Sequence, residues 1–200
     1  MPLAPPPERT KGTRSIVAKI GGLLSPRCHV GPGSDLGDMR AKDSRENGPH
    51  ALLQRMVGNW AGTSKLWLEP GKLEEETDIV GSMSLVQGWA FLQHDYVGSC
   101  MEKIQSGVAL FGYSCGEDRW TAAWTDSFHN GTRIMFSEGE HRGDISRIDV
   151  FGTYPAPPGP DWGWRTTVEL LSEDHIVITH YNITPEREEA KAVEIDYRRV

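Results

Sequence analysis

Cysteine is scarce in this chain of 200 residues, which has only Cys28, Cys100 and Cys115. The number is odd and no pair has the Cys-x-x-Cys spacing of zinc ligands, so the sequence supports neither a disulfide framework nor a zinc site. We therefore expect no bound metal ion. Unpaired cysteines are typical of reducing compartments, and the scarcity of cysteine favours a cytoplasmic protein.

Long apolar runs are also missing. The sequence has no stretch of about eighteen apolar residues, so we expect no membrane-spanning helix. The N-terminus lacks the apolar core and the small-residue cleavage site of a signal peptide. Residues 49–200 contain thirteen Lys and Arg against twenty-three Asp and Glu. Binding to phosphate backbones depends on cations, so this acidic segment argues against nucleic acid as a partner.

Acidic residues are absent from residues 9–34, and the segment before them is rich in proline. A composition of this kind buries little apolar surface, so we expect residues 1–48 to be a disordered N-terminal extension. Residues 15–20 offer an alternative, because they could form a short basic amphipathic helix of the type found in organelle-targeting segments. Gly21 and Gly22 would end that helix quickly.

The apolar pattern changes after residue 48. Leu52 and Met56 have helical spacing, which predicts one short helix over residues 49–57. From Trp60 onward, apolar and polar residues alternate with a period of two, and turn residues separate about ten such segments. Short strands with hairpin-length connections predict an all-β domain over residues 49–200. We expect an up-and-down antiparallel β-barrel of about ten strands with one short N-terminal helix.

Four blocks of sequence follow one another in the order and spacing of a known family. They are Gly58-Asn59-Trp60-Ala61-Gly62-Thr63, Ala123-Trp124-Thr125-Asp126-Ser127-Phe128-His129-Asn130-Gly131, Pro158-Gly159-Pro160-Asp161-Trp162-Gly163-Trp164-Arg165 and Tyr181-Asn182-Ile183-Thr184-Pro185. On these blocks, residues 49–199 resemble the DUF1579 family of uncharacterised, mostly bacterial proteins. That family is similar to the calycin group of lipocalin-like barrels, which includes fatty-acid-binding proteins and haem-binding nitrobindins. The resemblance implies a barrel with an internal cavity, and it implies no particular activity.

Asp126 and His129 are the weak candidates for catalysis. They lie at the start of a turn that Asn130 and Gly131 close. An imidazole oriented by a carboxylate is suited to proton transfer, so the pair could act at the cavity mouth. The alternative is structural, because aspartate is common at turns, where its carboxylate accepts backbone N–H groups.

Haem binding is an alternative function that depends on a histidine pointing into the barrel. His180 is the best candidate for the iron ligand, since Ile176 and Ile178 share its strand face. The opposite face of this strand is about equally apolar, so the pattern does not determine which face is inside. A lone histidine in a strand is more often a hydrogen-bonded structural residue.

The favoured interpretation is a barrel that binds a small apolar or amphipathic molecule in its cavity. Trp60 and Trp124 are candidate walls, Tyr96 and Arg165 are candidate polar anchors, and Trp162 belongs to a proline-rich loop that could cover the ligand. Three alternatives remain, namely a haem-dependent sensor or isomerase similar to nitrobindins, a small enzyme, and a barrel filled by its own side chains. The pattern does not predict an oligomeric state.

Overall fold

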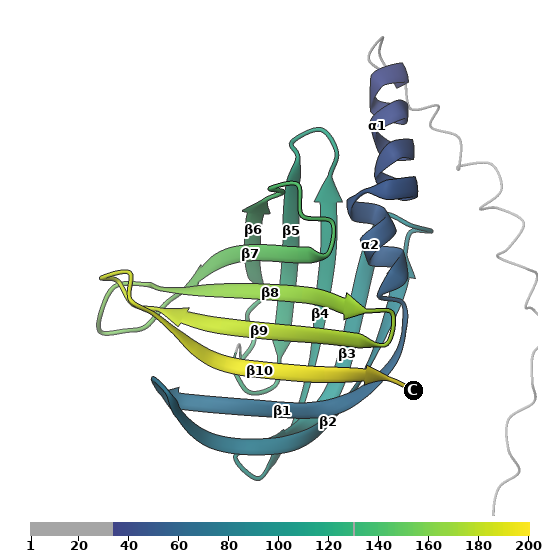
Figure 1. Cartoon of the computed structure of the whole chain (residues 1–200). Helices are drawn as coiled ribbons and strands as arrows, with labels where there is room; N and C mark the ends of the chain where they lie inside the picture. Colours follow the sequence, from purple (N-terminus) through teal and green to yellow (C-terminus); the bar gives the residue numbers. More distant parts are fainter. Residues whose placement is uncertain (1–33, 130) are drawn as a thin grey trace, which may run out of the picture. The chain divides into compact units, whose positions relative to one another are not determined.

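The structure, a computed structural model of the chain, describes residues 34–129 and 131–200. Within these residues, ten strands form one closed antiparallel barrel, and two helices precede the first strand (Figure 1). The elements are α1 Ser34–Asn47, α2 Pro49–Arg55, β1 Gly58–Glu69, β2 Lys72–Val86, β3 Phe91–Cys100, β4 Lys103–Ser114, β5 Arg119–Asp126, β6 Met135–Glu140, β7 Arg147–Tyr154, β8 Trp162–Ser172, β9 His175–Ile183 and β10 Glu189–Arg199. The expected all-β up-and-down barrel is confirmed.

The barrel follows the simplest possible topology. Each strand pairs with its neighbours in the sequence, and β1 closes the barrel by pairing with β10. At this seam Trp60 lies opposite Arg199, and Leu66 lies opposite Val193. A closed barrel has no unpaired strand edge.

Two glycines, Gly58 and Gly62, flank Trp60, and the close approach of β1 and β10 explains why position 62 requires glycine. A Cβ atom on Gly62 would lie 1.8 Å from the carbonyl oxygen of Asp196 on β10. Any other residue at this position would therefore force the seam apart. Trp60 itself is 1% exposed, and its Nε1 donates a hydrogen bond to the carbonyl oxygen of Met56, 3.0 Å away. The indole thus packs against the residue that follows α2, at one end of the barrel.

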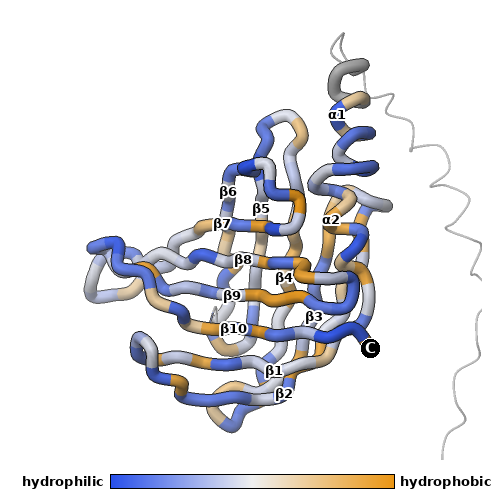
Figure 2. Tube along the Cα trace, in the orientation of Figure 1, coloured by the Kyte–Doolittle hydropathy of each residue, from blue (hydrophilic) through white to orange (hydrophobic). Residues whose placement is uncertain are grey.

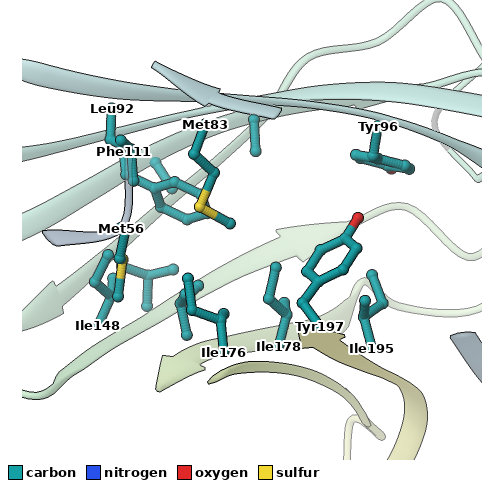
Figure 3. Close-up of a cluster of buried hydrophobic side chains, with 14 of the residues drawn as sticks. Met56, Met83, Leu92, Tyr96, Phe111, Ile148, Ile176, Ile178, Ile195 and Tyr197 are labelled. Carbon is teal, nitrogen blue, oxygen red and sulfur yellow. The ribbon is translucent and has the colours of Figure 1, made fainter. Parts of the chain in front are cut away.

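The core of the barrel is continuous from one wall to the other. Figure 3 shows Met83, Leu92 and Phe111 facing Ile176 and Ile178 across the interior. These residues come from strands that alternate buried and exposed positions, because successive side chains of a strand point to opposite faces. Hydrophobic and hydrophilic residues accordingly alternate along the strands in Figure 2.

The structure contains a second helix that the apolar pattern does not predict. Helix α2 corresponds to the expected short helix and contributes Leu52 and Leu53 to the core. Helix α1 lies within the segment expected to be disordered, and its surface is mostly hydrophilic (Figure 2), so it has no apolar stripe to detect. Ser44 fixes its last turns to α2, since Ser44 Oγ lies 2.8 Å from Nδ1 of the buried His50.

The remainder of the expected extension, including the candidate targeting segment at residues 15–20, lies outside the described residues. Neither helix in the described part of the chain has the length and apolar content needed to cross a bilayer.

Candidate functional site

A row of alternating large and small residues crosses five strands of the barrel wall. Trp60, Gly81, Tyr96, Gly107 and Asp126 lie opposite one another in succession on β1 to β5. The three large members are at most 8% exposed, so this row faces the interior. The Tyr96 ring extends across the glycine of the next strand, because a Cβ atom on Gly107 would lie 2.2 Å from Tyr96 Oη. The structure therefore directs the Tyr96 hydroxyl across β4 towards β5, the strand that carries Trp124 and Asp126.

Three stacked rings form the centre of the interior. The Trp124 and Trp164 rings are 5.6 Å apart and 13° from parallel. The His180 imidazole stacks on both, with centroids 5.5 Å from Trp124 and 5.4 Å from Trp164. Trp124 Nε1 donates a hydrogen bond to Tyr96 Oη over 3.0 Å. Side chains from four strands, β3, β5, β8 and β9, thus meet in one aromatic cluster.

Two histidines, the buried His94 and the half-buried His180, lie inside the barrel as neutral rings. Nδ1 of His180 shares a hydrogen bond of 2.9 Å with Thr166 Oγ1, and Nε2 of His94 lies 3.3 Å from Tyr197 Oη. Burial, followed by the nearby His129 and His94, lowers the pKa of His180 to about 3 against the opposing effect of Asp126. Burial also lowers the pKa of His94 to about 4. Neither ring carries a charge near neutral pH.

The two tyrosines near these histidines keep their protons. Burial raises the pKa of Tyr197 far above the ordinary tyrosine value. Burial, with the added effect of Asp126, raises the pKa of Tyr96 in the same direction. Figure 3 shows the Tyr197 ring extending into the interior from the wall opposite Tyr96. Both hydroxyl groups remain available as neutral hydrogen-bonding groups.

Asp126 and His129 are brought together where β5 ends. The Asp126 side chain has no exposed surface, whereas that of His129 is 24% exposed. Asp126 Oδ1 accepts the backbone N–H of His129 at 2.6 Å, and Oδ2 lies 2.5 Å from His129 Nδ1. Gln105 Nε2 donates to the same Oδ2 at 2.9 Å. A carboxylate accepts hydrogen bonds, so Nδ1 carries the imidazole proton in this pair.

Two small internal cavities adjoin the aromatic cluster. The inner chamber has a volume of about 30 Å³, and its further lining includes His94, Thr166 and Ile178. The outer chamber has a volume of about 20 Å³, and its further lining includes Gln105 and His129. The two chambers share five lining residues, which are Tyr96, Trp124, Trp164, His180 and Ile195. The partly exposed His129 therefore lies between the outer chamber and solvent.

The family-model comparison covers most of the chain. The model described as "Protein of unknown function (DUF1579)" matches residues 45–199. The chain belongs to the DUF1579 family. The matched segment begins within α1 and includes every strand of the barrel.

Solved structures resemble this DUF1579 barrel in fold only. "Crystal Structure of Rv2717c from M. tuberculosis" matches with a TM-score of 0.51 and 13% sequence identity, over 74% of this chain and 97% of that one. A protein of unknown function of the DUF3598 family from Nostoc punctiforme PCC 73102 matches with 8% identity over 76% of this chain and 99% of that one. Its TM-score of 0.23 is too low to support an argument. No curated protein matches the chain.

Three of the candidate ligand-binding residues lie outside both chambers. Trp60 packs at the α2 end of the barrel, as described above. Trp162 is partly buried at the start of β8 and lies opposite Tyr154. Arg165 is on the outer face of the DUF1579 barrel, where it forms ion pairs with Glu189 at 2.5 Å and Asp149 at 3.4 Å. The hydrogen bond to Glu189 is the main reason that the pKa of Arg165 is raised.

Larger hollows of about 600 and 740 Å³ lie on the outer surface and open to solvent. The first is lined by charged residues that pair with one another, including Arg119 with Glu138 at 3.4 Å. The second is an open groove along β1 to β5, whose lining includes Val80, Val97 and Val108 as well as Trp60, Tyr96 and Asp126. Neither hollow is lined by His129, Trp164 or His180.

Haem does not fit the interior of this DUF1579 protein. The two chambers have volumes of about 30 and 20 Å³. Pockets for drug-sized ligands begin at roughly 300 Å³, which is far larger. Trp124 and Trp164 also stack on the His180 ring, so these two indoles occupy the space that a porphyrin bound to His180 would need. Among the described residues, no group of three or more His, Cys, Asp or Glu side chains could hold a metal ion.

Sequence reasoning missed several members of the site. His94, Gln105 and Thr166 were not among its main candidates, although each could have been found from strand alternation. His94 lies two residues before the inward Tyr96, and Thr166 lies two residues after the inward Trp164, so each shares the face of its neighbour. Gln105 needed the register between β4 and β5, which places Gly107 opposite Asp126.

Proposed function

We propose that this protein binds a small amphipathic molecule inside the barrel, between the aromatic cluster and the Asp126–His129 pair. The chambers restrict the ligand to a few non-hydrogen atoms, and rotation of Trp124 or Trp164 would join them into one larger space. Aromatic rings and Ile195 offer apolar walls. Tyr96 and His180 offer polar groups beside them.

The observation that carries this proposal is the Trp164 indole N–H. Trp164 is 5% exposed, and its Nε1 is buried without a hydrogen-bond partner among the described residues. A buried donor without an acceptor costs about 1–3 kcal/mol. A ligand whose acceptor atom reached this N–H would remove that cost. The proposed ligand therefore combines a compact apolar body with one hydrogen-bond acceptor, as small ketones, aldehydes and amides do.

The test is a ligand-observed NMR screen with acetone, butanone, cyclopentanone and acetamide as probes. Trp164→Phe keeps a ring in the wall and removes the donor. Loss of about 1–3 kcal/mol corresponds to an affinity roughly 5- to 150-fold lower in this variant. Trp67→Phe is the matched control, because Trp67 lies outside both chambers and its ring contacts Lys191 instead.

Binding that is retained by Trp67→Phe and weakened by Trp164→Phe would support the proposal. Equal affinities for the two variants would refute the role of the indole N–H. A complete absence of binding by all four probes would refute the proposed ligand class and favour a barrel filled by its own side chains.

A further inference from the structure

The Asp126–His129 pair has more hydrogen bonds than a turn requires. An aspartate that caps a turn needs only the bond from its carboxylate to a backbone N–H, which Oδ1 and the His129 N–H form at 2.6 Å. The second bond, from Oδ2 to the ring atom Nδ1, fixes the imidazole as well. Gln105 holds the same carboxylate oxygen from β4. These contacts orient a side chain that the turn itself could leave free.

Fixing Nδ1 determines what the other ring nitrogen can do. With the proton on Nδ1, Nε2 carries a lone pair and can accept a proton. Within residues 34–129 and 131–200, no hydrogen bond to Nε2 of His129 is present. The ring lines the outer chamber, and its centroid lies 5.8 Å from that of Trp124 and 6.0 Å from that of Trp164. Trp164, whose buried indole N–H has no hydrogen-bond partner among the described residues, thus lines the same chamber as this proton acceptor.

We infer that His129 is a general base that removes a proton from the carbon next to the carbonyl group of a small ketone or aldehyde bound in the outer chamber. This inference rests on the proposed function, since it needs a ligand whose oxygen accepts the Trp164 N–H. The outer chamber has a volume of about 20 Å³, so the ligand binds there after Trp124 rotates and joins this chamber to the inner one.

The reaction needs no other reactant. His129 Nε2 takes the proton as the C–H bond breaks, and the C–H electron pair forms a carbon–carbon double bond. The carbonyl π electrons move to the oxygen, and the Trp164 N–H donates a hydrogen bond to the resulting enolate. The protonated imidazole then returns a proton to the same carbon or to a conjugated one, which gives exchange or isomerisation.

The other titratable groups that face His129 are less suited to this role. His180 has a pKa of about 3, which makes it a weak base. Tyr96 is held in its protonated form, because burial raises its pKa. Asp126 acts through its two bonds to His129 and is therefore a positioning residue. His129 is the remaining group at the chamber that combines a free lone pair with exposure to solvent, through which the proton can leave.

The test is hydrogen exchange in D₂O, followed by proton NMR on acetone, butanone and cyclopentanone. We expect the full-length protein to accelerate exchange of the hydrogens next to the carbonyl group above the buffer rate. A general base contributes about 10²- to 10⁴-fold, so His129→Gln should lose at least about tenfold of this acceleration. His129→Phe provides a second variant, and circular dichroism checks that each one folds.

His175→Gln is the matched control, since His175 also pairs with a carboxylate, Asp196, at 3.0 Å and lines neither chamber. It should keep the full acceleration. Saturation-transfer NMR on the same samples separates the two proposals. Binding without accelerated exchange would overturn the role of His129 as a base and leave the binding function intact. Acceleration that survives in both His129 variants would also overturn it, whereas failure of every ketone to bind would overturn the ligand class in both proposals.

Discussion

Replacing Trp60 with alanine tests whether its indole holds the α2 end of the barrel closed. Trp60 is 1% exposed, so the substitution would remove a fully buried indole and leave a cavity. Large-to-small changes of this kind cost about 3–5 kcal/mol. The carbonyl oxygen of Met56 would also lose its donor, and the Arg199 guanidinium would lose the ring that it covers at 4.3 Å. We expect a loss at the upper end of that range, about 4–5 kcal/mol.

Urea unfolding followed by far-UV circular dichroism measures this loss directly, without interference from the other tryptophans. A change of this size corresponds to a fall in Tm of roughly 8–20 °C for a protein of this length. Trp60→Phe separates the two contributions, because it keeps a ring and removes the N–H donor, and it should cost about 1–2 kcal/mol. Trp67→Ala on the outer face is the control. A loss below about 1 kcal/mol for Trp60→Ala would show that the indole does not close the barrel.

Three further predictions concern the interior and the outer face. Gly107→Ala places a Cβ atom 2.2 Å from Tyr96 Oη, so it should lower the free energy of unfolding in urea by about 1–3 kcal/mol. An unchanged unfolding midpoint would mean that the Tyr96 ring moves freely. Between pH 7 and pH 5 the unfolded chain protonates His94 and His180, whose folded pKa values are about 4 and 3. The free energy of unfolding should therefore decrease as the pH is lowered below about 6.5, and at pH 5 the loss should be about 2 kcal/mol per histidine. In urea titrations at pH 7 and pH 5, His180→Gln should remove about half of this loss. Arg165→Ala should change stability by less than about 1 kcal/mol and leave probe binding in NMR titrations unaltered, because its side chain lies on the outer face.

The architecture was accessible from the sequence because barrel strands leave a regular signature. Alternation with a period of two is imposed by the strand itself, and one buried face makes it visible in the sequence. Helix α1 leaves no such signature, since Lys42 and Glu46 pair on its surface and polar residues attach it, Ser44 to His50 and Arg45 to the Trp89 ring. Polar contacts between helices have no periodicity that could reveal them.

The candidate site was only partly accessible. Asp126 and His129 are three residues apart, so local turn geometry was enough to predict their contact. The orientation of His180 was not, because both faces of β9 are apolar in sequence. The structure resolves it through partners on β8, since Thr166 bonds to His180 inside the barrel. Tyr181 faces outward on the same strand, where it lies under the Arg165 guanidinium at 4.2 Å.

The balance of polar groups inside the barrel favours a specific site over inert filling. A barrel that needs only a stable interior can be filled with aliphatic side chains, which have no hydrogen-bonding groups to satisfy. Here two histidines are kept neutral by burial, at a cost that grows as the pH falls. Within the part of the chain that the structure describes, the buried N–H of Trp164, a residue that lines both chambers, has no hydrogen-bond partner. A ligand with a single acceptor would complete the arrangement of this buried donor and the oriented imidazole of His129.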